Sequence, residues 1–180
     1  MPVSQFDIAP LSGAALWGYL EQARTMHLAT AVPGEAIEVS PVWFVVCDES
    51  LYFFIDPVVG DPGRSLTPSS RHLAALDGDG GLSAVVADGD DITTFRGVQV
   101  AGRAVAVTDE ALVTDLLDLS LEKYFYIGHP HLEAFLSRGM CDARRWFHVI
   151  ADRLQGWDRR LLPQPPIMER RVLPAHLRGG

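Results

Sequence analysis

Apolar and polar positions follow first a helical and then an extended pattern in the first third of the chain. Between Leu16 and Ala23 apolar residues recur at helical spacing, and Ser12 precedes them as a residue type that caps helices. Three stretches rich in β-branched and aromatic residues follow at about 26–32, 37–47 and 51–55, with short turn sequences between them. This pattern predicts a helix followed by three antiparallel strands joined by hairpins.

The middle of the chain combines a turn-rich insertion with two further strands. Residues 57–69 are rich in proline, glycine and serine, which predicts a long loop inserted in the domain. A helical turn at 71–76 precedes a strand at 82–87, and a longer strand follows at 93–107. Gly102 interrupts the longer strand and indicates a β-bulge, which lets a sheet curl. We therefore expect an antiparallel sheet that closes toward a barrel.

The last third returns to helical spacing before a final strand. Thr108 is the predicted cap of a helix that has an acidic first turn and an apolar stripe reaching about Tyr124. A second helix is predicted over Pro130–Gly139, because proline favours the first helical position and glycine the position just after the end. We expect a last strand within 146–157 and an extended proline-rich tail at 163–180.

The composition fits a single packed domain over residues 1–180, with the barrel at about 14–160. Of the 180 residues, 48% are hydrophobic, and the formal net charge of −8 argues against nucleic acid or an anionic membrane as partner. Cys47 and Cys141 show neither a zinc-ligand nor a disulfide-framework spacing, so we expect no metal site and a cytoplasmic location.

The familiar catalytic signatures are absent from the sequence. It contains no G-x-S-x-G, H-E-x-x-H or G-x-x-x-x-G-K-S/T motif, so its chemistry is expected to come from a cofactor. Lys123 is the only lysine, which leaves 14 arginines as the other basic residues. The neighbouring Arg144 and Arg145 are expected to be solvated charges.

One short segment carries groups suited to a phosphate. Ser69, Ser70, Arg71 and His72 stand at the start of the helical turn at 71–76. Free N–H groups and the positive dipole end of a helix favour an anion there, and an arginine can add a bidentate contact. In the alternative interpretation, Ser70 only caps the turn and Arg71 is a surface charge.

Several segments together resemble the pyridoxamine 5′-phosphate oxidase-like family, the FMN-binding split β-barrels. The likeness covers roughly residues 14 to 160 and rests on the order and spacing of motifs. It implies a mainly β, α+β fold: an antiparallel split β-barrel with a few peripheral helices, forming a homodimer. The segments that carry it are Met26–Thr30, Val39–Phe44, Leu51–Asp56, Ser70–His72, Arg96–Gly102 and Asp152–Trp157.

The resemblance also implies a set of cofactor-binding residues. In the family a serine, an arginine and a lysine hold the FMN phosphate; Ser70 and Arg71 match the first two, and His72 replaces the lysine. A bound phosphate would favour the charged form of His72. Gly97 stands where the family usually has a glutamine. The family strand that lies along the flavin ring corresponds to Ser40, Pro41, Val42 and Trp43. The start of the family's last long strand corresponds to Arg96, and the aromatic residue that flanks the ring corresponds to Trp157.

The implied function is a flavin-dependent oxidoreductase that moves a hydride between bound FMN and a small organic substrate. The arginine and histidine that hold the substrate of a true vitamin B6 oxidase are not recognisable in 163–171, so that activity is not expected. Two alternatives stay open: an F420-dependent reductase with Arg64, Arg71 and Arg96 near the anionic cofactor, or a non-catalytic protein that binds flavin or haem, with His27, His129 or His131 as haem ligand. The loop Asp56–Ser70 is expected to cover the cofactor mouth.

Overall fold

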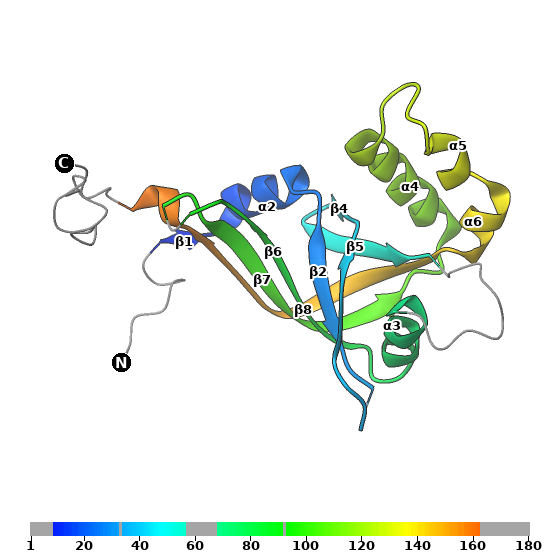
Figure 1. Cartoon of the computed structure of the whole chain (residues 1–180), viewed down its shortest axis with the longest axis horizontal. Coiled ribbons are helices and arrows are strands. Elements are labelled where there is room, and N and C mark those ends of the chain that lie inside the picture. Colours follow the sequence, from blue (N-terminus) through cyan, green and yellow to red (C-terminus); the bar gives the residue numbers. More distant parts are fainter. Residues whose placement is uncertain (1–8, 33, 57–67, 92, 163–180) are drawn as a thin grey trace, which may run out of the picture.

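A computed structural model describes residues 9–32, 34–56, 68–91 and 93–162. A curled antiparallel sheet forms its centre, and helices lie at the two ends and along one side (Figure 1). The predicted loop at 57–69 lies outside the described residues except for its last two, which begin a helix, and the predicted tail at 163–180 lies outside them altogether. The elements in chain order are β1 (Pro10–Leu11), α2 (Gly13–Gln22), β2 (Met26–Thr30), β3 (Glu38–Val42), β4 (Phe44–Cys47), β5 (Ser50–Ile55), α3 (Pro68–Asp77), β6 (Gly81–Asp88), β7 (Arg96–Ala106), α4 (Glu110–Tyr124), α5 (Leu132–Phe135), α6 (Arg138–Ala143), β8 (Arg145–Asp158) and a 3₁₀ turn at Arg159–Leu161.

The strand order in the sheet is β3-β2-β6-β7-β8-β5-β4, and β1 pairs with β8. Every pairing is antiparallel, which confirms the expected split-barrel class of fold. The strand predicted over 37–47 is wrong as a single element. Its first half pairs with β2 and its second half with β5, so the chain changes partner at Trp43 and the two halves lie at opposite ends of the strand order.

The two longest strands, β7 and β8, confirm the bulge predicted at Gly102. The register between them shifts between Ala101 and Gly102. A Cβ atom at Gly102 would lie 2.1 Å from the carbonyl oxygen of Ile150, so the close approach of the two backbones at this point excludes any side chain.

Two of the predicted helix ends are corrected by the structure. The cap of α4 is Asp109 and not Thr108, because the Asp109 carboxylate accepts the N–H groups of Ala111 (2.9 Å) and Leu112 (3.3 Å). The single helix predicted over Pro130–Gly139 is two short helices, α5 and α6, and the glycine expected to end it lies inside α6. A new helical turn starts at Ser137, so the glycine is not needed as a terminator.

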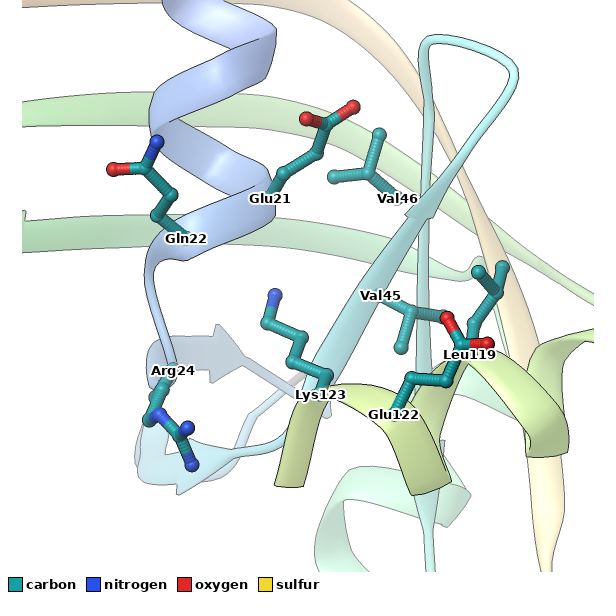
Figure 2. Close-up of a pocket in the computed structure, with 8 residues that line it drawn as sticks. All are labelled: Glu21, Gln22, Arg24, Val45, Val46, Leu119, Glu122 and Lys123. Carbon is teal, nitrogen blue, oxygen red and sulfur yellow. The ribbon is translucent and has the colours of Figure 1, made fainter. Parts of the chain in front are cut away.

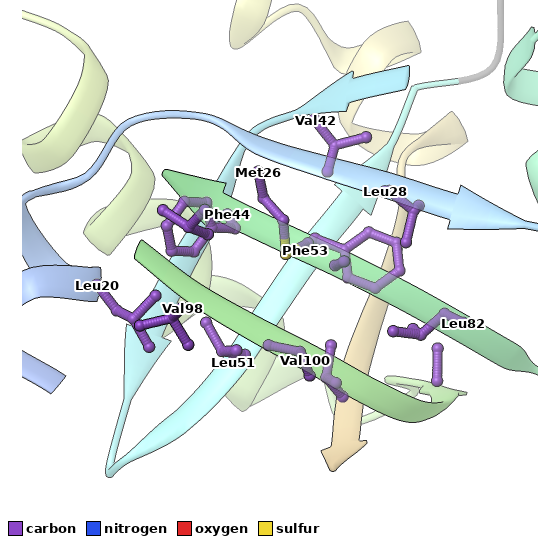
Figure 3. Close-up of a cluster of buried hydrophobic side chains, with 14 of the residues drawn as sticks. Leu20, Met26, Leu28, Val42, Phe44, Leu51, Phe53, Leu82, Val98 and Val100 are labelled. Carbon is purple, nitrogen blue, oxygen red and sulfur yellow. The ribbon is translucent and has the colours of Figure 1, made fainter. Parts of the chain in front are cut away.

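The hydrophobic core has two parts. The larger part fills the inside of the curled sheet and includes the side of α2 that carries Leu16, Tyr19 and Leu20 (Figure 3). The smaller part lies between the sheet and helices α4 and α5, around Phe54 and Trp146. Among the described residues, no helix is long and apolar enough to cross a membrane.

Candidate functional site

A cavity of about 350 Å³ opens where β3 passes into β4. The end of β5 forms its second wall, and one residue of α3 closes it. Most of the lining is apolar or aromatic, with a few polar groups, which is the usual make-up of a small-molecule site. The lining residues are Ser40, Pro41, Val42, Trp43, Phe54, Ile55, Asp56 and His72.

Trp43 is the largest exposed aromatic surface in this cavity wall. Its side chain is 39% exposed, although its ring stacks on Tyr124 with a centroid distance of 4.5 Å and an interplanar angle of 6°. The Tyr124 hydroxyl accepts the N–H of Phe44 (3.0 Å) and lies 2.7 Å and 2.9 Å from the carbonyl oxygens of Phe44 and Arg24, either of which it can donate to. Helix α4 therefore holds Trp43 in place at the cavity.

His72 is buried, with only 1% of its surface exposed. Its Nδ1 lies 2.9 Å from Thr30 Oγ1, whereas its Nε2 is buried and has no hydrogen-bond partner in the part of the chain that is described. Burial lowers the pKa of the imidazole, and the nearby Glu38 carboxylate opposes this only in part. The surroundings thus favour a neutral imidazole at neutral pH, in contrast to the charged form expected beside a phosphate.

Arg71 lies next to His72 in the first turns of α3 and reaches strand β3. Its Nη1 donates to Glu38 Oε2 at 3.2 Å, and its side chain remains 42% exposed. The Nε of Arg71 is buried and has no partner among the described residues. Because Glu38 lies directly opposite Thr30 in the sheet, Arg71 and His72 contact the same end of the β2–β3 pair. Ser70 precedes them in the same helix.

The other two predicted cofactor residues lie elsewhere on this chain. Arg96, at the start of β7, donates two hydrogen bonds to Asp88 (2.8 and 3.1 Å), and its guanidinium lies 4.6 Å from the centre of the Tyr19 ring. Trp157, on β8, is 3% exposed and lies against Gly97, where a Cβ atom would come within 2.6 Å of the indole. The glycine found in place of a glutamine is therefore what makes room for this ring.

Trp157 also borders a second cavity of about 470 Å³ on the outer face of the sheet. His27, Val39 and Gln99 contribute to the same cavity from β2, β3 and β7. No residue lines both this cavity and the one at Ser40–Trp43. One chain thus brings together Ser40, Pro41, Val42, Trp43 and His72, with Arg71 alongside, and keeps Arg96 and Trp157 apart from them.

Sequence reasoning missed the charged pair behind the first cavity. The Arg144 side chain is 1% exposed, so the expectation of a solvated charge is wrong for this residue. It donates two hydrogen bonds to Asp56 (2.7 and 3.3 Å) and lies between the rings of Phe54 and Phe135, at 4.5 and 3.8 Å from their centres. Arg145, by contrast, keeps part of its surface in solvent and pairs with Asp77.

Comparison with known proteins identifies the fold. No family model and no curated protein matches the chain. Among solved structures, a conserved hypothetical protein from Mycobacterium tuberculosis is 22% identical with a TM-score of 0.68, over 89% of this chain and 94% of that one. The flavocytochrome Anf3 from Azotobacter vinelandii is 16% identical with a TM-score of 0.62, over 93% and 77% of the two chains. An FAD-binding protein from Mycobacterium smegmatis is 18% identical with a TM-score of 0.54, over 83% and 98%. The chain thus shares its fold with these proteins, two of which are described as an FAD-binding protein and a flavocytochrome, and this is the split-barrel fold expected from the sequence.

Proposed function

We propose that this protein is an oxidoreductase that binds FMN in the cavity at Ser40–Trp43 and exchanges a hydride with a small organic substrate. The observation that carries the proposal is the buried Nε2 of His72, which stands in the wall of this cavity without a partner from the described residues. A buried polar atom without a hydrogen bond costs about 1–3 kcal/mol, and a ligand atom that pairs with it recovers that cost. The shared fold with flavin-binding proteins supports the same conclusion.

The cavity fits a planar heterocycle. Val42, Trp43, Phe54 and Ile55 provide apolar and aromatic walls, and the neutral His72 imidazole provides a polar atom at the edge. A flavin ring carries both N–H and carbonyl groups at its edge, so either tautomer of His72 finds a complementary atom. When bound, the flavin supplies the hydride chemistry, whereas the protein binds it, orients it and keeps water from the ring.

The phosphate of FMN is assigned to the first turns of α3. Arg71 is the cation there, and the positive end of the dipole of the ten-residue helix α3 lies at the same turns. Among the described residues the guanidinium makes one contact, 3.2 Å long, with Glu38, which leaves further N–H groups to donate to a dianion. Ser70 is the hydroxyl that precedes this arginine in the same helix.

The proposal includes a homodimer formed through the outer face of the sheet. Ile37 and Val39, at the β3 edge of this face, are 69% and 59% exposed, and small apolar residues of β6 border the cavity beside them. An apolar face of this kind is typical of protein interfaces. Trp157 and Ser40–Trp43 line different cavities of one chain, so a flavin site that uses both needs a second copy.

The absorbance spectrum of the purified protein tests the proposal directly. We expect flavin bands in the blue or, for protein purified without cofactor, saturable binding when FMN is added. A Soret band would favour the haem-binding alternative, and binding of F420 without FMN would favour the deazaflavin reductase. A colourless protein that binds none of the three would contradict the proposed function and leave the fold unaffected.

The dimer has a separate test. Val39→Lys places a charge on the outer face at a position that is already exposed, so it is compatible with the folded single chain. Sedimentation should show a dimer for the unchanged protein and a monomer for this variant. A monomer in both cases would contradict the assembly, and flavin binding measured on the same samples shows whether the site depends on it.

A further inference from the structure

A third cavity, of about 390 Å³, lies between helix α2, strand β4 and helix α4 (Figure 2). It shares no lining residue with the cavity assigned to the flavin. Its apolar wall comes from β4 and α4, and its polar groups come from the end of α2 and from α4. The lining residues are Glu21, Gln22, Arg24, Val45, Val46, Leu119, Glu122 and Lys123.

Lys123, the only lysine in the chain, extends from α4 toward α2 in this cavity (Figure 2). Its Nζ donates to the carbonyl oxygen of Leu20 at 3.1 Å and lies 3.8 Å from the centre of the Phe44 ring. None of the ion pairs within the described residues includes Lys123. Within the described part of the chain, Lys123 thus contacts a neutral carbonyl group and aromatic rings, and no carboxylate lies within ion-pair distance.

The surroundings of Lys123 favour the uncharged amine more than water does. Burial lowers the pKa of Lys123 to about 8, the positive charge of Arg24 adds to this, and Glu21 opposes it. At pH 7 an amine with this pKa is uncharged in about one molecule in ten, against fewer than about one in a thousand for a solvated lysine. A desolvated lysine beside another cation is a recognised form of activated nucleophile.

We propose that this cavity is a covalent binding site in which the Lys123 amine captures small neutral aldehydes as imines. The amine lone pair forms a bond to the aldehyde carbon, and the carbonyl oxygen leaves as water with the two hydrogens of the amine. No oxidant or reductant is needed. The imine nitrogen then takes up one proton from solvent, and the resulting N–H can donate to the Leu20 carbonyl, so the contact between α4 and α2 survives the reaction.

The lining selects the class of aldehyde. Val45, Val46 and Leu119 offer an apolar wall to a short hydrocarbon chain. Two carboxylates, Glu21 and Glu122, border the cavity against the one guanidinium of Arg24, so beside an uncharged Lys123 the lining is net negative and disfavours an anionic aldehyde. A short, neutral and apolar aldehyde suits both features.

Reductive labelling tests this site with unusual clarity, because the chain has a single lysine. The folded protein is incubated with butanal and cyanoborohydride, and peptide mapping follows butylation of Lys123 and of the terminal amine. At pH 7 we expect Lys123 to react at least about tenfold faster than N-acetyl-lysine, since its larger uncharged fraction outweighs its lower basicity. The rate should rise with pH and level off above about 8, and Lys123→Arg should abolish the internal label.

Two substitutions at the cavity change the local charge in opposite directions. Arg24→Gln removes a positive charge near the amine and should slow labelling at pH 7, whereas Glu21→Gln removes a negative charge and should accelerate it. A lysine that served only to connect the two helices would not respond in this paired way. Labelling no faster than N-acetyl-lysine, or a change in the same direction for both variants, would overturn the proposal.

A comparison of two aldehydes tests the binding wall apart from the amine. The labelling rate of Lys123 is divided by the labelling rate of N-acetyl-lysine, first with butanal and then with the polar aldehyde glyceraldehyde. We expect the ratio for butanal to be several times the ratio for glyceraldehyde, because only the hydrocarbon chain of butanal gains apolar contact with the wall. Equal ratios would show a reactive lysine without a binding site and would overturn the proposal.

Discussion

Two regions of the molecule each contain an arginine that the sequence singles out, and the two arginines have different partners. At the start of β7, Arg96 makes two hydrogen bonds to Asp88, and nearby Arg160 makes a comparable pair with Asp158. At α3, Arg71 makes one 3.2 Å contact with Glu38, and its buried Nε has no partner among the described residues. We call these the paired region and the open region.

The difference separates a structural from a binding role. An arginine that already donates two hydrogen bonds to a carboxylate has fewer N–H donors left for a ligand. A buried polar atom that lacks a hydrogen bond is instead stabilised by a ligand that bonds to it. The paired region also contains one buried polar group that has no partner among the described residues, and it does not indicate a ligand. The Tyr19 hydroxyl is buried there without a partner from the described chain, and burial raises its pKa to about 12, so it stays neutral and adds no charge.

The largest effect should come from Arg71→Ala in the open region. The variant should weaken FMN binding by about 1.5–3 kcal/mol, the usual worth of hydrogen bonds to a charged group, while thermal stability changes little. Arg96→Ala is the matched control, since it removes an arginine that forms an ion pair with Asp88. Fluorescence titration with FMN compares the two. Equal losses of affinity in both variants would mean that the two regions belong to one site.

A second effect concerns the packing of the paired region. Gly97→Ala places a Cβ atom 2.6 Å from the Trp157 ring and 2.7 Å from the backbone oxygen of Val86, so the variant should lose about 1–3 kcal/mol of unfolding free energy. Gly18→Ala is the control, because that glycine lies within α2 with nothing in the space a Cβ would take, and it should gain about 0.5–1 kcal/mol. Chemical denaturation measures both. An unchanged stability of Gly97→Ala would show that Trp157 moves freely.

The two regions should also differ in the pH range over which each loses its contribution to the free energy of unfolding. Burial lowers the pKa of His72, so on acidification its imidazole takes up a proton in the unfolded chain before it does so in the folded chain. The free energy of unfolding therefore falls as pH drops below the usual range of histidine. One such group contributes at most about 1.4 kcal/mol per pH unit. In the paired region the hydrogen bond from Arg160 lowers the pKa of Asp158, so its contribution is lost only below the usual range of aspartate.

Variants assign this pH dependence to its source. His72→Gln should flatten the fall in stability between pH 7 and pH 5, measured as the midpoint of urea denaturation. Burial also lowers the pKa of His148, so His148→Gln provides the comparison for a histidine outside the cavity. If His72→Gln left the slope unchanged, the imidazole would not be held neutral in the folded protein.

The fold followed from the sequence more readily than the site. Alternating apolar residues and turn sequences indicate most of the strands, and Gly102 indicates the bulge. These features can be read from the sequence because each one depends on residues that are close together in the chain. The division of 37–47 at Trp43 depends on which strand each half pairs with, and no local pattern carries that information. Burial of Arg144 depends on rings from β5 and α5 that surround it, so an adjacent pair of arginines gave no sign of it.

The candidate site shows the same limit. Ser40–Trp43 and His72 were singled out through family resemblance, and the structure places them in one cavity although they are far apart in sequence. That His72 is buried and bonded to Thr30 could not be deduced, since the histidine follows an arginine in a polar segment. Asp56 appeared in the sequence only as the last residue of one family-like segment and the first residue of the predicted loop.

The smallest effect tests whether the paired region is purely structural. Asp88→Asn leaves Arg96 without its carboxylate, and because this pair is partly exposed the loss of stability should be only about 0.2–1 kcal/mol and smaller still in high salt. The same change should lower the pKa of Tyr19, since the Asp88 charge helps to raise it, and ultraviolet titration follows that tyrosine. Asp90→Asn, at an exposed carboxylate in the same turn, should do neither. If the cavity at Ser40–Trp43 of one chain holds the cofactor alone, FMN affinity should be equal in all three proteins, because a cation freed 4.6 Å from the Tyr19 ring lies outside that cavity. A rise in affinity for Asp88→Asn would instead show that Asp88 withholds Arg96 from the cofactor.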